Sequence, residues 1–138
     1  MPARFPYLPA ASDRGDSALM PLVPLSLRFK DGDPVGAHGL LDSGATVNVL
    51  PYGLGLQLGV VWEAQTTRVI LTGNLAAQEA RALLLKVRVA DFVPVPLVFA
   101  WTRNENVPLL LGQVNFFEEF DICFRRAQRQ FEIEPARK

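Results

Sequence analysis

Residues 40–46 read Leu-Leu-Asp-Ser-Gly-Ala-Thr, which places a carboxylate between an aliphatic pair and a second apolar run over residues 47–50. An ionisable group in such surroundings is costly to bury unless it is hydrogen-bonded or shares a proton. Gly44 lets backbone amides come close to the Asp42 carboxylate, and Ser43 adds a hydroxyl that can both donate and accept. The pattern therefore indicates a carboxylate that is held for chemistry.

Asp, Ser and Gly also form ordinary turns, so the triplet alone does not separate a functional loop from a turn between two strands. The flanks favour the functional loop, because an ordinary hairpin turn has polar shoulders and this one has apolar shoulders on both sides. A second apolar run over residues 107–111 stops at Gly112 and precedes a predicted short helix. The two segments are best interpreted together.

Together they resemble the half-site of the aspartic proteases of the retropepsin type. In that family an Asp-Thr/Ser-Gly-Ala loop is braced by a hydrophobic-hydrophobic-Gly segment just before the C-terminal helix. The order and spacing match over residues 20–133. The resemblance implies an all-β fold, a retropepsin-like closed acid-protease β-barrel with one short C-terminal helix. We expect this domain to span residues 22–138, after a proline-rich N-terminal arm over residues 1–21.

Size and composition are consistent with that expectation. The chain has 138 residues, 49% of them hydrophobic, and a formal net charge of zero, so one domain with a packed core is expected. The charge balance gives no indication of a nucleic acid or an anionic membrane as partner. No apolar run approaches the ~18–20 residues that a bilayer requires, and the N-terminal residues lack the apolar segment of a signal peptide. We therefore expect a cytoplasmic protein without a membrane partner.

The chain has a single cysteine and a single histidine, which limits the disulfides and metal sites that it can form. Cys123 excludes an internal disulfide, and its neighbours Ile122 and Phe124 predict a buried, inert thiol. His38 alone leaves no histidine-based metal cluster, so we expect neither a metal nor a cofactor. A pairing of His38 with Ser43 stays open as a minor alternative.

Alternating apolar and polar residues predict strands and little helix. The expected strands cover residues 25–30, 35–42, 47–50, 66–71, 80–89, 95–101 and 109–111. Residues 52–59 contain three glycines and are expected to form at most one helical turn.

The one helix that the sequence predicts follows Gly112. Asn115 suits its N-cap and Glu118 completes a capping box, with Val114, Phe117 and Phe120 expected to face the core. Beyond it, residues 123–124 and 131–133 predict a final hairpin whose basic turn is read as solvated rather than as a binding patch.

Aspartic-protease chemistry requires two carboxylates that share one proton. This chain has a single Asp-Ser-Gly loop, because Asp91 and Asp121 lack a following Ser/Thr-Gly. An active enzyme is therefore expected to be a C2 homodimer with one Asp42 from each subunit at the axis. The expected function is that of an aspartic endopeptidase that hydrolyses peptide bonds between apolar residues of a peptide or protein substrate.

The resemblance also assigns roles around Asp42. Ser43 would bond across the dyad, Gly44 would bring backbone groups to the carboxylates, and the hairpin over residues 72–75 stands where the family carries its flap. The substrate-binding residues implied are Leu40, Ala45, Thr46, Thr72, Gly73, Asn74, Leu75, Pro108 and Leu110. Of these, Leu40, Pro108 and Leu110 are equally plausible as plain core.

Two positions depart from the viral members of the family. Those members pair an acidic residue after the Asp-Thr/Ser-Gly-Ala core with an arginine after the later glycine, whereas Thr46 and Gln113 occupy these positions here. A hydrogen bond in place of the ion pair would preserve the chemistry and leave the tightness of the dimer open.

A second function class also remains open. The same fold can serve as a non-catalytic dimerisation or peptide-binding module, which needs the barrel and a groove but no paired carboxylates. The intact Asp42-Ser43-Gly44 run favours the enzyme, because an idle carboxylate at a dimer axis would be a standing electrostatic cost.

Overall fold

The computed structural model describes residues 1–11, 17–71, 73–76 and 78–138. The strands are β1 (Ala3–Pro6), β2 (Leu8–Ala11), β3 (Ser17–Met20), β4 (Leu22–Arg28), β5 (Val35–Leu41), β6 (Asn48–Leu50), β7 (Arg68–Val69), β8 (Ala80–Val89), β9 (Val95–Thr102), β10 (Leu110–Leu111), β11 (Phe120–Arg125) and β12 (Gln130–Pro135). The helices are α1 (Tyr52–Gln57) and α2 (Phe116–Glu119), with 3-10 turns η1 (Trp62–Ala64), η2 (Gly73–Leu75) and η3 (Arg126–Gln128).

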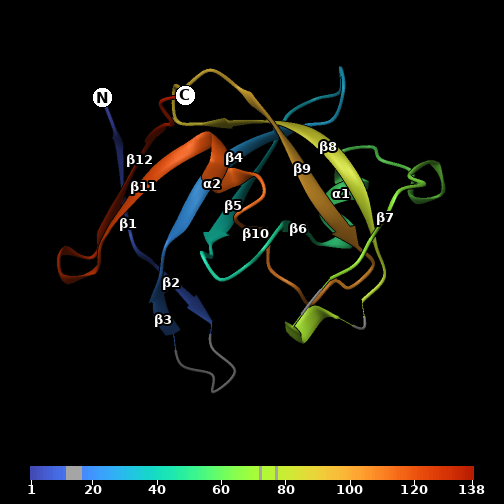
Figure 1. Ribbon diagram of the computed structural model, residues 1–138, viewed down its shortest axis with the longest axis horizontal. Coiled ribbons are helices and arrows are strands. Elements are labelled where there is room, and N and C mark those ends of the chain that lie inside the picture. Colours follow the sequence, from blue (N-terminus) through green and yellow to red (C-terminus); the bar gives the residue numbers. More distant parts are fainter. Residues whose placement is uncertain (12–16, 72, 77) are drawn as a thin grey trace.

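Six strands close into a barrel in the order β4-β5-β10-β6-β9-β8, and β8 pairs back with β4 (Figure 1). The short strand β10 lies parallel to β5, and β6 lies parallel to β9, while the remaining barrel pairs are antiparallel. β7 extends the sheet from β8. The closed, mostly β architecture confirms the predicted fold class.

Strand alternation explains which side chains fill the barrel. In β8, Leu83, Leu85, Val87 and Val89 are at most 2% exposed, and the residues between them face outward. Each aliphatic side chain buried in this way contributes about 1.5–3 kcal/mol relative to exposure. Phe99 and Trp101 of β9 complete the interior.

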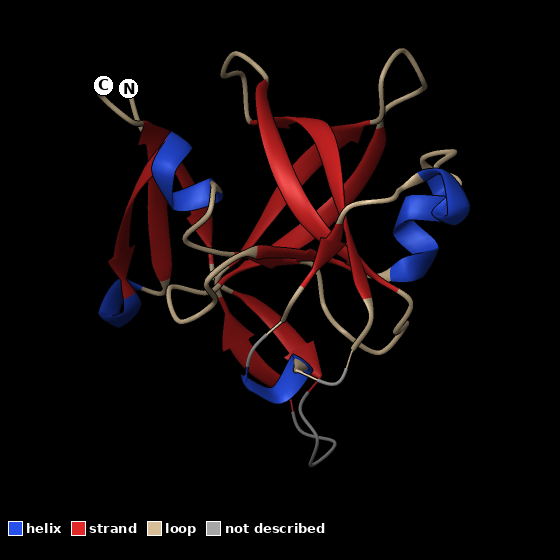
Figure 2. Ribbon diagram, turned by 45° about the vertical axis from the view of Figure 1, so that its right-hand side comes forward, coloured by secondary structure: helices blue, strands red, loops and turns tan. Residues whose placement is uncertain are grey.

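A smaller sheet of order β1-β12-β11 stands beside the barrel, next to α2 and the chain ends (Figure 2). Phe5 stacks on Phe131 with ring centroids 5.5 Å apart, and Tyr7 meets the same ring edge-on at 5.8 Å. The predicted N-terminal arm thus contributes β1 to a sheet, followed by the β2–β3 hairpin. A domain boundary at residue 22 stays a prediction.

Residues 52–57 form α1, which is longer than the single helical turn that was predicted at most for residues 52–59. A Cβ atom on Gly55 would collide with the Trp101 ring, and Trp101 Nε1 donates to the Tyr52 carbonyl at 3.1 Å. The glycine is therefore required by a close helix–strand contact and does not break the helix. Among the described residues, no helix is both long enough and apolar enough to cross a bilayer.

Three predictions near the C-terminus were also wrong. Cys123 is exposed, because it lies on the opposite face of β11 from the buried Phe120 and the half-buried Ile122. Val114 is 51% exposed, because it precedes α2, and Phe116 instead fills the core at 0% exposure. Asn115 is the N-cap residue of α2 as predicted, but its side chain caps no helical N–H and bonds to β9 instead.

Candidate active site

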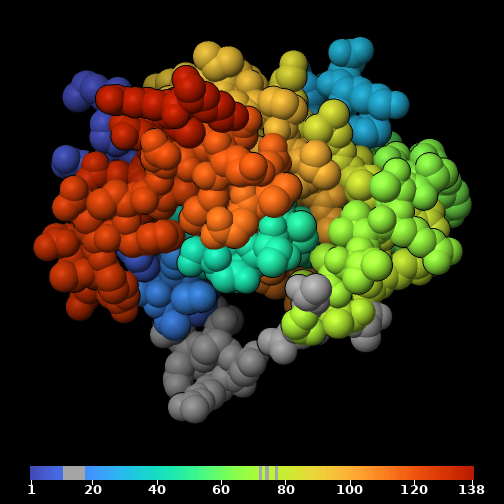
Figure 3. Space-filling view, viewed as in Figure 1, coloured from blue at the N-terminus to red at the C-terminus, as the bar shows by residue number. Residues whose placement is uncertain are grey.

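The candidate loop begins where two short parallel strands stop together. Leu40 N–H donates to the Leu109 carbonyl at 2.8 Å, and Asp42 N–H donates to the Leu111 carbonyl at 3.0 Å. These bonds join β5 to the segment around β10 and fix the point at which Asp42 leaves the sheet. In the space-filling view, the teal segment that follows β5 reaches the surface beside the orange segment containing α2 (Figure 3).

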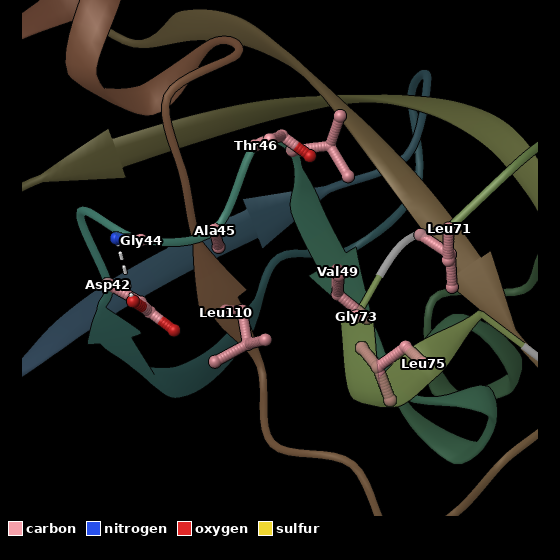
Figure 4. A pocket seen from close by; sticks show the side chains of 10 residues that line it. Asp42, Gly44, Ala45, Thr46, Val49, Leu71, Gly73, Leu75 and Leu110 are labelled. Carbon is pink, nitrogen blue, oxygen red and sulfur yellow. Dashed lines mark hydrogen bonds between the residues drawn. The ribbon is translucent and has the colours of Figure 1, made fainter.

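The Asp42 loop turns back on itself. Gly44 N–H donates to Asp42 Oδ1 at 2.9 Å, and Ala45 N–H donates to the Asp42 carbonyl at 3.1 Å. A Cβ atom on Gly44 would stand 3.3 Å from Oδ1, so a larger residue would press on this bond. Asp42 itself is half-buried, and its carboxylate lies with one oxygen held by the loop backbone (Figure 4).

The segment after β10 braces this loop through its backbone. Gln113 N–H donates to the Ala45 carbonyl and Val114 N–H to the Thr46 carbonyl, both at 2.9 Å. A Cβ atom on Gly112 would lie 2.5 Å from the Val47 carbonyl oxygen and 2.8 Å from that of Ala45. Only glycine permits this approach, so the two sequence segments that carried the prediction lie directly against each other.

The Gln113 side chain adds a further contact to the Asp42 loop. Its Nε2 donates to the Ser43 carbonyl at 2.8 Å. Among the described residues, no hydrogen bond joins the side chains of Thr46 and Gln113, whose pairing had been considered in place of the viral ion pair. The Gln113 amide bonds instead to the backbone of Ser43, three residues earlier in the loop.

The buried side-chain amide of Asn48, which was not predicted from the sequence, holds the segment after β10 from the interior of the protein. Asn48 is 0% exposed, its Oδ1 accepts from Gly112 N–H at 2.8 Å, and its Nδ2 donates to the Val98 carbonyl at 3.0 Å. Asn115 adds bonds to Val98 N–H at 3.0 Å and to the Pro96 carbonyl at 3.1 Å. The only sequence signal for these hydrogen bonds was a polar residue, Asn48, between Val47 and Val49 in an apolar run.

A pocket of about 280 Å³ opens beside the Asp42 carboxylate (Figure 4). Its walls combine the loop, the ends of β6 and β10, and the segment around η2. The lining residues are Asp42, Gly44, Ala45, Thr46, Val47, Val49, Leu71, Gly73, Leu75 and Leu110. Asp42 is the one ionisable side chain among them, and the opposite wall is aliphatic.

Two solved structures share this architecture. The retroviral protease-like domain of Ddi1 from Leishmania major matches with a TM-score of 0.56 and 16% sequence identity, over 75% of this chain and 81% of that chain. A retropepsin-like aspartic protease from Rickettsia conorii matches with a TM-score of 0.60 and 17% identity, over 96% of this chain and 91% of that chain.

The chain has a retropepsin-like fold. No protein-family model matches its sequence, and no curated protein sequence matches it. At identities this low, the match extends to the fold alone.

Within the retropepsin-like fold, most of the predicted site residues come together. Those that line the pocket are Asp42, Gly44, Ala45, Thr46, Gly73, Leu75 and Leu110. Leu40 is half-buried in β5, Ser43 is exposed on the loop, and Pro108 is exposed, and none of these three lines the pocket. Thr72 lies outside the described residues, and for Asn74 only its place in η2 is described.

Three pocket residues were not predicted. Val47 and Val49 follow the loop directly, and Leu71 precedes the expected flap turn. Val47 and Val49 had been assigned to a strand, which is correct for Val49, but their role in the pocket wall depends on the fold. Residues 73–75 form a 3-10 turn against this wall, where the sequence had predicted a simple hairpin turn.

Proposed function

We propose that this protein is an aspartic endopeptidase that acts as a homodimer, with one Asp42 from each subunit at the reaction centre. The observation that carries the proposal is the setting of the Asp42 carboxylate. It stands half-buried at an aliphatic pocket, with one oxygen held by Gly44 N–H at 2.9 Å. Within the described part of the chain, that is the one hydrogen bond that this carboxylate accepts.

The proposed chemistry uses two such carboxylates with one proton between them, because two like charges at short range do not both ionise. The ionised carboxylate removes a proton from water, whose oxygen attacks the scissile carbonyl carbon, while the protonated partner donates to the carbonyl oxygen. The tetrahedral intermediate then collapses and the C–N bond breaks. The leaving amine takes the proton that the first carboxylate removed from water, and the proton on the former carbonyl oxygen returns to the partner carboxylate. The pocket of one chain contains one carboxylate, so a second copy has to supply the other.

The remaining roles follow from the same proposal. Ser43 would bond across the two loops, and Gly44 would present backbone groups to the carboxylates and the substrate. The segment around Gly73 and Leu75 would cover the bound peptide. The aliphatic wall formed by Val49, Leu71 and Leu110 supports a preference for apolar side chains beside the scissile bond.

The alternative proposal is a retropepsin-fold module that dimerises or binds peptides without cleaving them. It would use the same apolar pocket but would not require a shared proton. The two proposals differ in what the Asp42 carboxylate does, so a substitution that preserves its shape separates them.

The deciding experiment is a peptide-library cleavage assay with the Asp42→Asn variant, at acidic and at neutral pH. We expect loss of peptide hydrolysis by about 10²–10⁴-fold or more with the fold retained, because the base and the shared proton are removed. Asp91→Asn, a matched change in the exposed turn after β8, should cleave like the parent protein.

A pepstatin-type transition-state mimic should inhibit the parent protein. Undiminished hydrolysis by Asp42→Asn would remove Asp42 from the mechanism. Peptide binding without hydrolysis by either protein at any concentration would favour the non-catalytic module.

A further inference from the structure

The strand pair that closes the barrel carries a cluster of cations on its outer face. In the register of β4 with β8, Ser26 lies opposite Arg88 and Arg28 lies opposite Lys86. Leu27 and Val87 between them are buried, so the four flanking side chains point away from the core. Facing residues in such a pair have Cβ atoms about 4.5–5.5 Å apart, and the diagonal neighbours about 7–8 Å. Three cations and one hydroxyl therefore occupy a small rectangle.

This arrangement is electrostatically unfavourable in the isolated chain. Like charges directly opposite each other destabilise a strand pair, and Arg28 faces Lys86. Within the described residues, none of the ion pairs or cation–ring contacts involves Arg28, Lys86 or Arg88.

Two exposed cations elsewhere in the chain do have anionic partners. Arg125 donates to Glu132 at 2.7 Å, and this hydrogen bond raises the pKa of Arg125. Lys138 bonds Glu119 at 2.7 Å. None of the three cations at the barrel closure forms such an ion pair within the described residues.

The same four side chains line a pocket of about 150 Å³ together with Pro34 and Pro94. The prolines belong to the loops that follow β4 and β8, and their fixed φ angles stiffen the two walls. This pocket shares no lining residue with the pocket at Asp42. Lys86 also borders a larger groove of about 530 Å³, which is lined by the apolar surface of Phe29 and Leu84 and by the charged residues Lys30 and Asp31.

We propose that the pocket formed by Ser26, Arg28, Lys86 and Arg88, here named the closure site, binds the dianion of a phosphate monoester. Each guanidinium presents a planar fork that matches two phosphate oxygens, and Lys86 adds a point charge. Ser26 offers a hydroxyl donor at the fourth corner. The group that carries the phosphate would extend into the adjoining groove beside Leu84. The closure site does not depend on the peptidase proposal.

The test is titration calorimetry at constant ionic strength with three probes: inorganic phosphate, a short phosphoserine peptide and the same peptide without phosphate. We expect saturable binding of the first two and none of the third. Arg88→Gln should weaken the binding by about tenfold or more, because a charge-assisted bidentate contact is lost. Arg137→Gln removes the same charge from an exposed position near the C-terminus and should bind like the parent.

The two phosphate probes distinguish the source of the ligand. Tighter binding of the phosphopeptide assigns the closure site to a phosphorylated macromolecule, and equal binding assigns it to free phosphate. Non-saturable binding, equal weakening in Arg88→Gln and Arg137→Gln, or equal binding of the unphosphorylated peptide would each overturn the proposal. Circular dichroism of both variants verifies that an effect is not due to unfolding.

Discussion

At the scale of single residues, the Asp42 loop depends on a side chain that does not touch it. Asn48 is completely buried, and its amide satisfies Gly112 N–H and the Val98 carbonyl at once. Gly112 in turn packs against the carbonyls of Ala45 and Val47. A buried amide with all its partners in place stabilises one arrangement of the loop, because any shift would leave polar groups unpaired.

Asn48→Ala should therefore destabilise the protein strongly. The substitution leaves the buried Gly112 N–H and the partly buried Val98 carbonyl without this partner, and a buried unsatisfied group costs about 1–3 kcal/mol. Urea denaturation should show a lower midpoint for Asn48→Ala. Asn106→Ala, at an exposed loop position, should stay within about 0.5 kcal/mol of the parent. Equal midpoints for the two variants would contradict the role of Asn48.

Sequence reasoning identified the parts of the site that are local and missed those that are not. Gly44 donates to a carboxylate only two residues away, so the Asp-Ser-Gly run already implied that contact. The partners of Asn48 stand 50 and 64 positions away along the chain, and no pattern near Asn48 reveals them. The burial of Gly112 against two carbonyl groups likewise depends on the parallel pairing of β5 with β10.

At the scale of elements, three of the longer strands were predicted well, whereas β4 begins three residues before its predicted start and the short elements were predicted poorly. β5, β8 and β9 begin or end within a residue or so of their predicted bounds, because each buries one face along its whole length. α1 was underestimated, since the contact that requires Gly55 lies on Trp101 of a distant strand. β7 is only two residues long, where a β-branched run had predicted a longer strand.

The brace around β10 makes a matched pair of glycine substitutions informative. Gly112→Ala would place a methyl group 2.5 Å from the Val47 carbonyl oxygen, whereas a Cβ atom on Gly36 would meet nothing closer than 4.0 Å. We expect Gly112→Ala to lower the free energy of unfolding by about 1–3 kcal/mol or more through overpacking against backbone. Gly36→Ala should be nearly neutral in the same denaturation experiment. A neutral Gly112→Ala would show that the brace can move away.

At the scale of the whole molecule, the proposed chemistry requires two chains. Specific activity should rise with protein concentration, because each subunit contributes one Asp42 to the shared site. Analytical ultracentrifugation over the same concentrations should show a dimer forming in parallel with activity. A monomer whose activity is strictly proportional to concentration would contradict the shared site.

The pairing of β4 with β8, which closes the barrel, is also expected to limit the folding rate. Ser26 and Arg88 are paired although the whole of β5 and β6 lies between them in the chain. Bringing them together costs loop-closure entropy before their contacts can form. We expect refolding in milliseconds to seconds, as for other proteins dominated by distant strand pairing. Added salt should accelerate it by screening the repulsion between Arg28 and Lys86 as the two strands approach. Stopped-flow refolding at low and high sodium chloride measures both effects, and a microsecond, salt-independent phase that accounts for the full amplitude would show that the strands meet by another route.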